Sequence, residues 1–330
     1  MSISNFRKYM LVGLASILVL ILVSFNLDAA SYKIKLEQQY PLTSATVVAP
    51  YYDVIVAGTD PEAITAALSA ARNELKVLMI DKRQTKVLGG LMTLGWLNSL
   101  DLNKSPRISK EFPSPYLNKG IFHEWYKYIE GTSFDVNRAA NAFHKLVLDE
   151  PNIDLLLSVQ SMEPIVENNK AVGMAIMKED GKELIVSAGA IIDGTQDADI
   201  AAAAGASYTI YREDIGEPNV SMAVTLVFKL SGVTDAIWKE LRQHKGVGSD
   251  ARSIWGYPDT REYVSSNPTR VRMRSLNIGL QDDNTILINS MQIYGIDPLD
   301  PESVKEGLEI GKKEAPLIVD FLKKEIQTVQ

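Results

Sequence analysis

The chain has 330 residues, of which 46% are apolar and 23% charged, as is ordinary for a globular protein. This composition excludes a disordered or collagen-like chain, and a formal net charge of −7 excludes a strongly basic nucleic-acid-binding protein. The absence of Cys excludes disulfides, thiolate zinc sites, iron–sulfur clusters and a Cys nucleophile, and with three His residues we expect no metal site.

The first 30 residues predict a membrane anchor or signal segment. Tyr9 to Leu27 is a run of nineteen residues without a charge, rich in Leu, Ile and Val. As a helix this run is roughly 28 Å long, about the thickness of the hydrocarbon core of a bilayer. Arg7 and Lys8 precede it and favour a cytoplasmic N-terminus. We therefore expect a single-pass cell-membrane protein with an extracytoplasmic catalytic domain.

A cleaved signal peptide is the alternative, and it would give a secreted protein. Asp28 disfavours cleavage, because it stands where the cleavage site needs a small residue. A buried core helix is the third interpretation. It is disfavoured because residues 31–51 have the composition of a polar linker.

A strand, a tight turn and a helix follow the linker. Residues 52–57 form a short run rich in β-branched side chains, typical of a buried parallel strand, and the run ends at Gly58. Asp60-Pro61-Glu62 supplies an N-cap, a Pro at the first helical position and an acid in the first turn. This order predicts an Ala-rich helix over residues 63–72.

The next apolar run, residues 76–80, ends in Asp81, at about the 20-residue spacing of a ribose-binding acid in a dinucleotide-binding unit. Such a unit needs three small residues in its turn, and Gly58 and Ala63 provide the first and third. Asp60 stands at the middle position, where its bulk and charge oppose a pyrophosphate. A well-capped helix without a nucleotide is therefore the alternative.

Two further glycines follow the second strand, in the segment Leu88-Gly89-Gly90-Leu91-Met92-Thr93-Leu94-Gly95-Trp96. With this segment the chain resembles bacterial FAD-dependent oxidoreductases of the glutathione-reductase-like type, in which a Gly-Gly segment runs along the flavin. The resemblance covers about Tyr52 to Val319. Gly194-Thr195-Gln196-Asp197 extends it, because Thr195 and Asp197 match the family's Ala-Thr-Gly-Asp, whereas Gly194 and Gln196 depart from it.

The pattern and the resemblance together imply an α/β fold. We expect a glutathione-reductase-like FAD/NAD(P)-binding three-layer fold with a parallel sheet and a β-meander, plus an antiparallel β region on the substrate side. Further strands are expected at 153–159, 162–166, 171–177, 183–186 and 188–193, antiparallel strands within 220–230 and 271–294, a hairpin turn at 282–284 and a helix over 302–321.

The expected domain organisation has four parts. These are an anchor or signal segment at 1–30, a linker at 31–51, an FAD-binding domain at 52–205 with a helical insertion near 116–150, and a substrate-side α+β region at 206–330.

The resemblance implies FAD as the cofactor. It implies cofactor contacts at nine residues: Gly58, Thr59, Asp60, Asp81, Arg83, Gly89, Gly90, Thr93 and Asp197. Asp81 is expected to accept hydrogen bonds from ribose hydroxyls, and Asp197 to hold the ribityl or pyrophosphate side. The alternatives are a solvated turn residue for Asp81 and a helix N-cap for Asp197.

The resemblance also implies a membrane-anchored FAD-dependent oxidoreductase acting on an unidentified small organic substrate. The Gly-rich segment that closes the flavin site in relatives is not found after Pro298. A non-catalytic or truncated flavin-fold binding or scaffold protein is therefore an alternative, as is one piece of a split enzyme with a C-terminal partner.

The sequence identifies no catalytic residue. We interpret His123 and His144 as satisfied surface or interface residues and His244 as exposed. Arg270, Arg272 and Arg274 alternate along one expected strand and so share a face. They either bind a carboxylate substrate or form a solvated sheet face.

Overall fold

The computed structural model describes residues 39–40, 42–103, 116–129, 131–257 and 259–325. All of them belong to one compact unit, residues 37–330. The predicted anchor, Tyr9 to Leu27, lies outside the described residues. Among the residues that are described, no helix has both the length and the apolar composition to cross a membrane.

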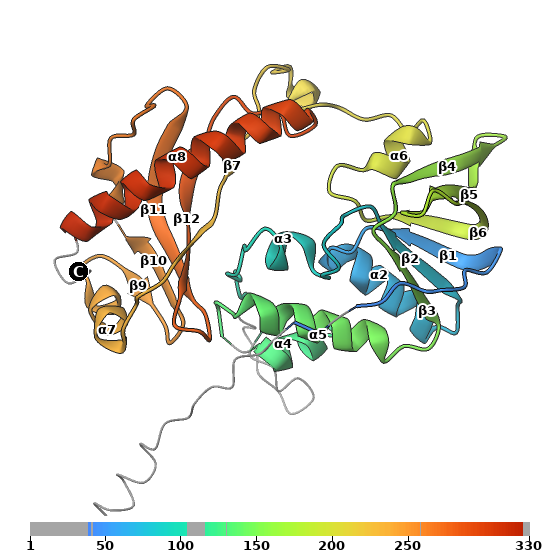
Figure 1. Ribbon diagram of the computed structural model, residues 1–330, viewed down its shortest axis with the longest axis horizontal. Coiled ribbons are helices and arrows are strands. Elements are labelled where there is room, and N and C mark those ends of the chain that lie inside the picture. Colours follow the sequence, from blue (N-terminus) through green and yellow to red (C-terminus); the bar gives the residue numbers. More distant parts are fainter. Residues whose placement is uncertain (1–38, 41, 104–115, 130, 258, 326–330) are drawn as a thin grey trace, which may run out of the picture. The chain divides into compact units, whose positions relative to one another are not determined.

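The first sheet contains six strands in the order β3-β2-β1-β6-β5-β4 (Figure 1). Its strands are β1 (Tyr51–Ala57), β2 (Val77–Asp81), β3 (Ile153–Leu157), β4 (Ser161–Glu167), β5 (Lys170–Met177) and β6 (Glu183–Asp193). β3, β2, β1 and β6 are parallel, whereas β6, β5 and β4 form an antiparallel meander. The predicted parallel sheet and β-meander are confirmed.

Strand β6 is longer than predicted, because the two expected strands at 183–186 and 188–193 are one continuous strand. Its first half pairs with β5 and its second half with β1, so Ser187 has Gly173 on one side and Tyr51 on the other. Ser187 and Ala188 contain no helix or strand breaker, and the absent side chain of Gly189 admits the backbone of Asp53. One strand thereby joins the meander to the parallel part.

The parallel strands lie between two further layers. Helices α2 (Pro61–Arg72), α4 (Ile121–Ile129) and α5 (Val136–Leu148) share a core with one face of the strands. The meander covers the other face, where its Met174 and Ile176 pack with Ile55 and Ile80. This arrangement is the three-layer fold that the sequence predicted, and α4 and α5 lie within residues 116–150, where the sequence predicts helices. The short helices are α3 (Gly90–Thr93) and α6 (Asp199–Ala203).

The second sheet is antiparallel, with the order β7-β12-β11-β10-β9 and β8 paired to β12. Its strands are β7 (Val224–Thr225), β8 (Phe228–Leu230), β9 (Gly248–Ser249), β10 (Ser253–Tyr257), β11 (Val271–Leu280) and β12 (Ile286–Ile293). The predicted hairpin turn is confirmed, since Gln281 N–H donates to the carbonyl oxygen of Thr285.

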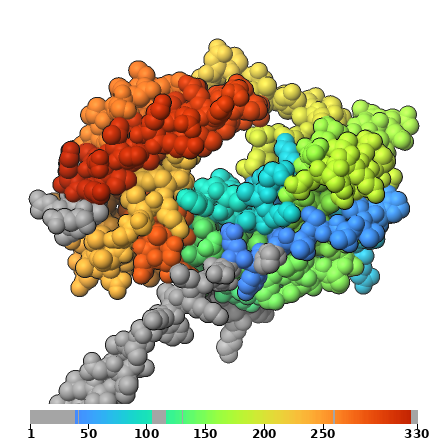
Figure 2. All heavy atoms as spheres, in the orientation of Figure 1, coloured from blue at the N-terminus to red at the C-terminus, as the bar shows by residue number. Residues whose placement is uncertain are grey.

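Helix α8 (Pro301–Glu325) lies along one face of the second sheet, and its Ile318 and Leu322 enter that core (Figures 1 and 2). The sequence had predicted this helix over a shorter range. Helix α7 (Asp235–Gln243) and strands β9 and β10 were not predicted, and the remaining elements are 3-10 turns at Glu213–Ile215 and Asp259–Glu262.

A buried carboxylate links α5 to the second sheet. Asp282, in the β11–β12 turn, forms ion pairs with Arg138 of α5 and, at 2.8 Å, with Arg252. The backbone N–H of Asp282 donates to Asp135 Oδ2 at 3.0 Å, and Asp135 also caps α5. The turn and the helix N-terminus therefore share one hydrogen-bonded network.

We expect Asp282→Asn to lower the free energy of unfolding by about 2–4 kcal/mol, because it removes the buried partner of two guanidinium groups. Asp283→Asn is the matched control, since Asp283 is exposed, forms an ion pair with Lys229, and accepts hydrogen bonds from Thr285 at Oδ1, which Asn retains. Loss of the exposed Lys229–Asp283 ion pair should lower the free energy of unfolding by less than about 1 kcal/mol. Urea unfolding of both variants measures the difference, and equal values would contradict the assignment.

Candidate functional site

The C-terminal ends of β1 and β2 meet at Gly58 and Asp81. Ala57 and Ile80 are paired in register, so the residues that follow them are neighbours. Gly58 has a φ of +101°, and a Cβ there would overlap the carbonyl oxygen of Gly194. Glycine is therefore required both by the backbone conformation and by the close approach of the loop after β6.

Asp81 is 4% exposed and accepts hydrogen bonds at both carboxylate oxygens. Arg83 donates to it from Nε at 2.9 Å and from Nη2 at 2.6 Å, and Thr59 donates its hydroxyl proton to Oδ2. Burial lowers the pKa of Arg83, but hydrogen bonds and charges from Asp81 and Asp60 outweigh burial and hold that pKa above its usual value. Arg83 therefore stays protonated, and its hydrogen bonds fix the orientation of the Asp81 carboxylate.

The sequence predicts that the side chain of Asp60 caps helix α2, but the structure shows that it does not. Its backbone has the N-cap conformation, yet its carboxylate makes no capping hydrogen bond. Asp60 is instead 1% exposed, with Oδ1 2.6 Å from Arg83 Nη1 and Oδ2 accepting from Gln196 Nε2. An ion pair with a guanidinium is stronger than a bond to a helix amide, which explains the difference.

The loop after β6 forms the opposite edge of the site. Thr195 caps α6 by accepting from the backbone N–H of Asp199 at 2.8 Å, and Asp193 holds Thr195. Asp197 makes no such cap, so its alternative interpretation as the N-cap is wrong. Gly194 is small for a structural reason, because a Cβ there would lie 2.6 Å from that of Ala63.

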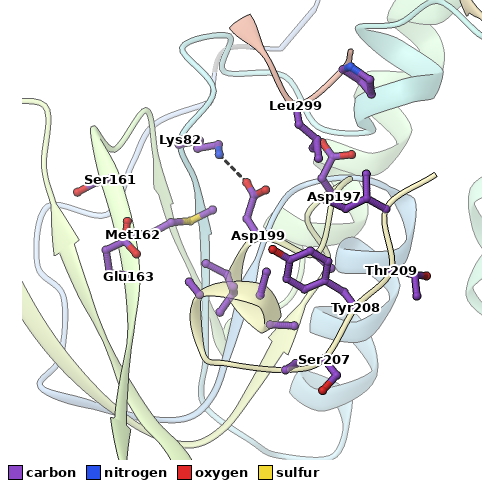
Figure 3. A pocket seen from close by; sticks show the side chains of 18 of the residues that line it. Lys82, Ser161, Met162, Glu163, Asp197, Asp199, Ser207, Tyr208, Thr209 and Leu299 are labelled. Carbon is purple, nitrogen blue, oxygen red and sulfur yellow. Dashed lines mark hydrogen bonds and ion pairs between the residues drawn. The ribbon is translucent and has the colours of Figure 1, made fainter. Parts of the chain in front are cut away.

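Two cavities open along this edge of the sheet. Five of the nine predicted residues line a cavity of about 250 Å³: Gly58, Asp60, Asp81, Arg83 and Asp197. A neighbouring cavity of about 780 Å³ shares Lys82, Met162, Asp197, Asp199, Pro298 and Leu299 with the first and adds α6 and the segment around Tyr208 (Figure 3). Lys82 and Asp199 form an ion pair of 2.5 Å across it.

The predictions missed several lining residues. Lys82 follows Asp81 directly, and Gln196 had been noted only as a departure from the family pattern. The position of Lys82 beside Asp81 and the unusual Gln196 in the motif are therefore the sequence signals that could have identified them. Met162 and Leu299 give no such signal, because apolar side chains are ordinary in any fold.

The predicted flavin-side residues form a group beside this cavity. Gly90 has a φ of +41°, and its absent Cβ leaves the space that the carboxylate of Asp60 occupies. A Cβ at Gly89 would lie 2.7 Å from Phe143, and Thr93 donates its hydroxyl proton to the carbonyl oxygen of Leu88. Gly89, Gly90 and Thr93 line neither cavity.

His144 fixes this segment and was misjudged from the sequence. It is fully buried rather than at a surface or interface, and its Nε2 accepts from the backbone N–H of Leu88 at 3.1 Å. Burial lowers the pKa of His144 to about 4. The imidazole is therefore neutral near pH 7, as an acceptor must be.

The three expected arginines do not act together. Arg270 precedes β11 and is engaged by Glu306, at 2.9 Å, and by the carbonyl oxygen of Tyr294. Arg272 and Arg274 are exposed on β11, and Arg272 lies over the ring of Tyr294. His244 is exposed as predicted.

The sequence of this chain matches the profile of the family described as FAD dependent oxidoreductase over residues 53–330. The chain belongs to this family. FAD is the cofactor that membership assigns to it, so the expected cofactor is confirmed. A comparison with curated proteins finds no match.

Several solved structures are similar to this family member. The myxobacterial chondrochloren halogenase CndH has a TM-score of 0.43 and 15% identity, with 83% of this chain and 60% of that chain covered. A geranylgeranyl bacteriochlorophyll reductase-like protein from Thermoplasma acidophilum has a TM-score of 0.41 and 16% identity, with 78% of this chain and 60% of that chain covered. THI4 of Thermovibrio ammonificans has a TM-score of 0.35 and 14% identity, with 57% of this chain and 68% of that chain covered. Similarity at this level says nothing about the reaction of this chain.

The residues of the site fit FAD, with one disagreement. Gly58 provides the turn, Asp81 provides a carboxylate suited to ribose hydroxyls, and Arg83 provides a planar donor suited to phosphate. Asp60 disagrees, because it places a buried negative charge beside the N-terminus of α2, where a diphosphate is expected.

We expect the stability of this family member to fall as the pH is lowered from about 6.5 to about 4. The folded-state pKa of His144 lies near 4, below the ordinary value of 6.5, so the unfolded state binds the proton more readily in this range. The contribution of His144 is present above pH 6.5 and is lost towards pH 4, by up to about 3 kcal/mol.

Urea unfolding at several pH values measures this loss. His144→Gln should flatten the dependence, because an amide oxygen can accept from Leu88 without titrating in this range. His244→Gln is the control and should leave the slope in place, since His244 is exposed. An unchanged slope in His144→Gln would assign the pH dependence to other groups.

Proposed function

We propose that this protein is an FAD-dependent oxidoreductase that binds FAD across the C-terminal ends of β1 and β2 and acts on a small organic substrate. The observation that supports this proposal is the convergence of Gly58, Asp81, Arg83 and Asp197 on one cavity. In a parallel sheet, the crevice at the C-terminal ends of the strands is the usual place for a ligand.

Each of these residues has a distinct proposed task. Asp81 accepts hydrogen bonds from ribose hydroxyls, and Thr59 holds its carboxylate in position. Arg83 and Lys82 supply positive charge to the phosphates. Asp197 borders both cavities and contacts the ribityl or phosphate side.

The Gly89-Gly90 segment lies against α5 and lets the flavin approach its backbone. His144 holds this segment in place by accepting a hydrogen bond from the backbone N–H of Leu88. When bound, FAD supplies the redox chemistry by accepting and donating electrons or hydride. The chain supplies position and shields the site.

The second sheet is the proposed substrate side. Asn98, which follows the Gly-Gly segment in sequence, packs on Gly279 of β11. The second sheet therefore contacts the segment that follows the flavin-side residues. The residues of β11 and β12 that alternate with its α8-facing core include Arg272, Asn277 and Gln292. These side chains offer hydrogen-bond donors and acceptors to a polar substrate.

A second candidate function is that of a non-catalytic flavin-fold binding or scaffold protein. The buried carboxylate of Asp60 favours it, because a like charge at the diphosphate position weakens dinucleotide binding. A folded sample that takes up no adenine dinucleotide would support this candidate and contradict the oxidoreductase.

We expect the full-length protein, purified in a mild detergent, to show the blue absorption band of oxidised flavin or to acquire it when FAD is added. Asp81→Asn should weaken FAD binding by about tenfold or more, because a neutral amide is a poorer acceptor for two ribose hydroxyls. Quenching of flavin fluorescence during titration measures the dissociation constant.

Asp154→Asn is the matched control for this variant. Asp154 is also a strand carboxylate with a hydroxyl donor, Tyr52, but it lines neither cavity. It should bind FAD as the wild type does. Redox activity is tested separately, by reducing the bound flavin without oxygen and following its reoxidation by an added electron acceptor. A bound flavin that does not cycle would favour the scaffold.

We also propose that Tyr9 to Leu27 anchors the protein in the cell membrane with the FAD-binding domain outside the cytoplasm. Its uncharged length and the preceding Arg7 and Lys8 support this orientation. Protease added to intact spheroplasts should then digest the domain, and the protein should remain with membranes after a carbonate wash. Release of a shortened, soluble protein would support signal cleavage instead.

A further inference from the structure

The side chain of Asp60 is the feature of the site that the cofactor does not explain. Asp60 begins helix α2, a position where a carboxylate ordinarily accepts from the first helix amides. Here it turns away from them and lies over Gly90, in the space that a Cβ at Gly90 would fill. The backbone N–H groups of Glu62 and Ala63 consequently have no acceptor among the described residues.

An ion pair and a hydrogen bond hold Asp60 in this orientation. Arg83 Nη1 lies 2.6 Å from Oδ1, and Gln196 Nε2 donates to Oδ2. Asp60 and Gln196 are two of the positions at which the sequence departs from the family pattern, and they contact each other across the cavity. We refer to Asp60, Arg83 and Gln196 as the Asp60 cluster.

The guanidinium of the Asp60 cluster has a second acidic partner outside the cluster. Arg83 is shared between the buried carboxylates of Asp60 and Asp81, beside the first turn of α2. The dipole of α2 favours an anion at its N-terminus, and the carboxylate of Asp60, which lies beside that N-terminus, interacts favourably with the dipole. A diphosphate approaching the free amides meets a like charge.

We propose that Asp60 occupies the diphosphate position in competition with the dinucleotide and thereby sets the affinity of the site. This inference rests on the proposed binding of FAD at the same cavity. Binding requires Arg83 and Gln196 to exchange the carboxylate of Asp60 for phosphate oxygens. A guanidinium and an amide N–H can donate to either partner, so the exchange needs no other group.

The exchange leaves Asp60 without its guanidinium partner, which opposes binding. Neutralising Asp60 removes both the repulsion and this cost, while Asp81 still pairs with Arg83. Asp60→Asn keeps the size of the side chain and should therefore bind FAD at least tenfold more tightly than the wild type. Asp60→Ser offers a second test, because Ser is a good N-cap and fits a helix N-terminus.

The experiment measures dissociation constants of FAD, ADP and adenosine for the full-length protein by titration calorimetry. If the effect lies at the diphosphate, both Asp60 variants should gain affinity for FAD and ADP, and affinity for adenosine should change less than threefold. Glu163→Gln is the matched control, since it removes a carboxylate from the wall of the neighbouring cavity and is not assigned to the phosphates. It should change FAD binding less than threefold.

The outcomes separate this inference from the proposed function. If the wild type binds FAD and the Asp60 variants bind equally or less tightly, the inference is overturned and the proposed function stands. If only the Asp60 variants bind, the inference is supported and FAD binding by the wild type is overturned. If none binds, both are overturned.

Two further results would also contradict the inference. An equal gain for adenosine would place the effect away from the diphosphate. An equal gain in Glu163→Gln would reduce the effect to the general charge around the two cavities. Thermal unfolding of each variant confirms that a folded protein is compared, and the Ser variant replaces the Asn variant if the latter does not fold.

Discussion

Arg83 forms ion pairs with two buried carboxylates, one at the end of β2 and one in the turn after β1. Asp81 ends β2, and Asp60 begins the helix after β1, so the pairing of β1 with β2 brings their negative charges together. Without a cation between them, both would be costly to bury. The direction of the Asp60 side chain and the charge of the cavity depend on this guanidinium.

Helix α5 connects this site to the rest of the molecule. Its C-terminal half carries His144, which holds the backbone of Leu88 and so the segment beside Asp60. Its N-terminus is capped by Asp135, which also accepts from Asp282 in the β11–β12 turn. The flavin-side segment and the second sheet are therefore fixed to opposite ends of the same helix.

The sequence predicts most of the fold, because hydrophobic periodicity and capping residues are local signals. The runs at 52–57 and 76–80 and the Pro61 start of α2 are confirmed, as are the meander and the antiparallel region. The sequence predicts two strands in place of the continuous β6 because Ser187 separates two apolar runs, although the pairing of Ser187 with two strands overrides that local signal. Strand β9 is too short to show a period, and Gly256 interrupts the apolar residues of β10.

The candidate site is predicted in composition but not in geometry. Five of the nine predicted cofactor residues line one cavity. The direction of the Asp60 side chain, however, depends on Arg83 and Gln196, and Gln196 lies far from Asp60 in the sequence. No local pattern reports such a partner. His144 was misjudged for the same reason, since its burial comes from the packing of α5 and not from its neighbours in sequence.

The long β6 strand has a consequence for biosynthesis. β1 is made early but pairs on one side with β6, which leaves the ribosome only after helices α4 and α5 and strands β3 to β5. Until then an apolar edge of β1 is exposed, and distant pairings of this kind form slowly. The nascent chain therefore passes through an aggregation-prone stage in which assistance from a chaperone has the greatest effect on yield.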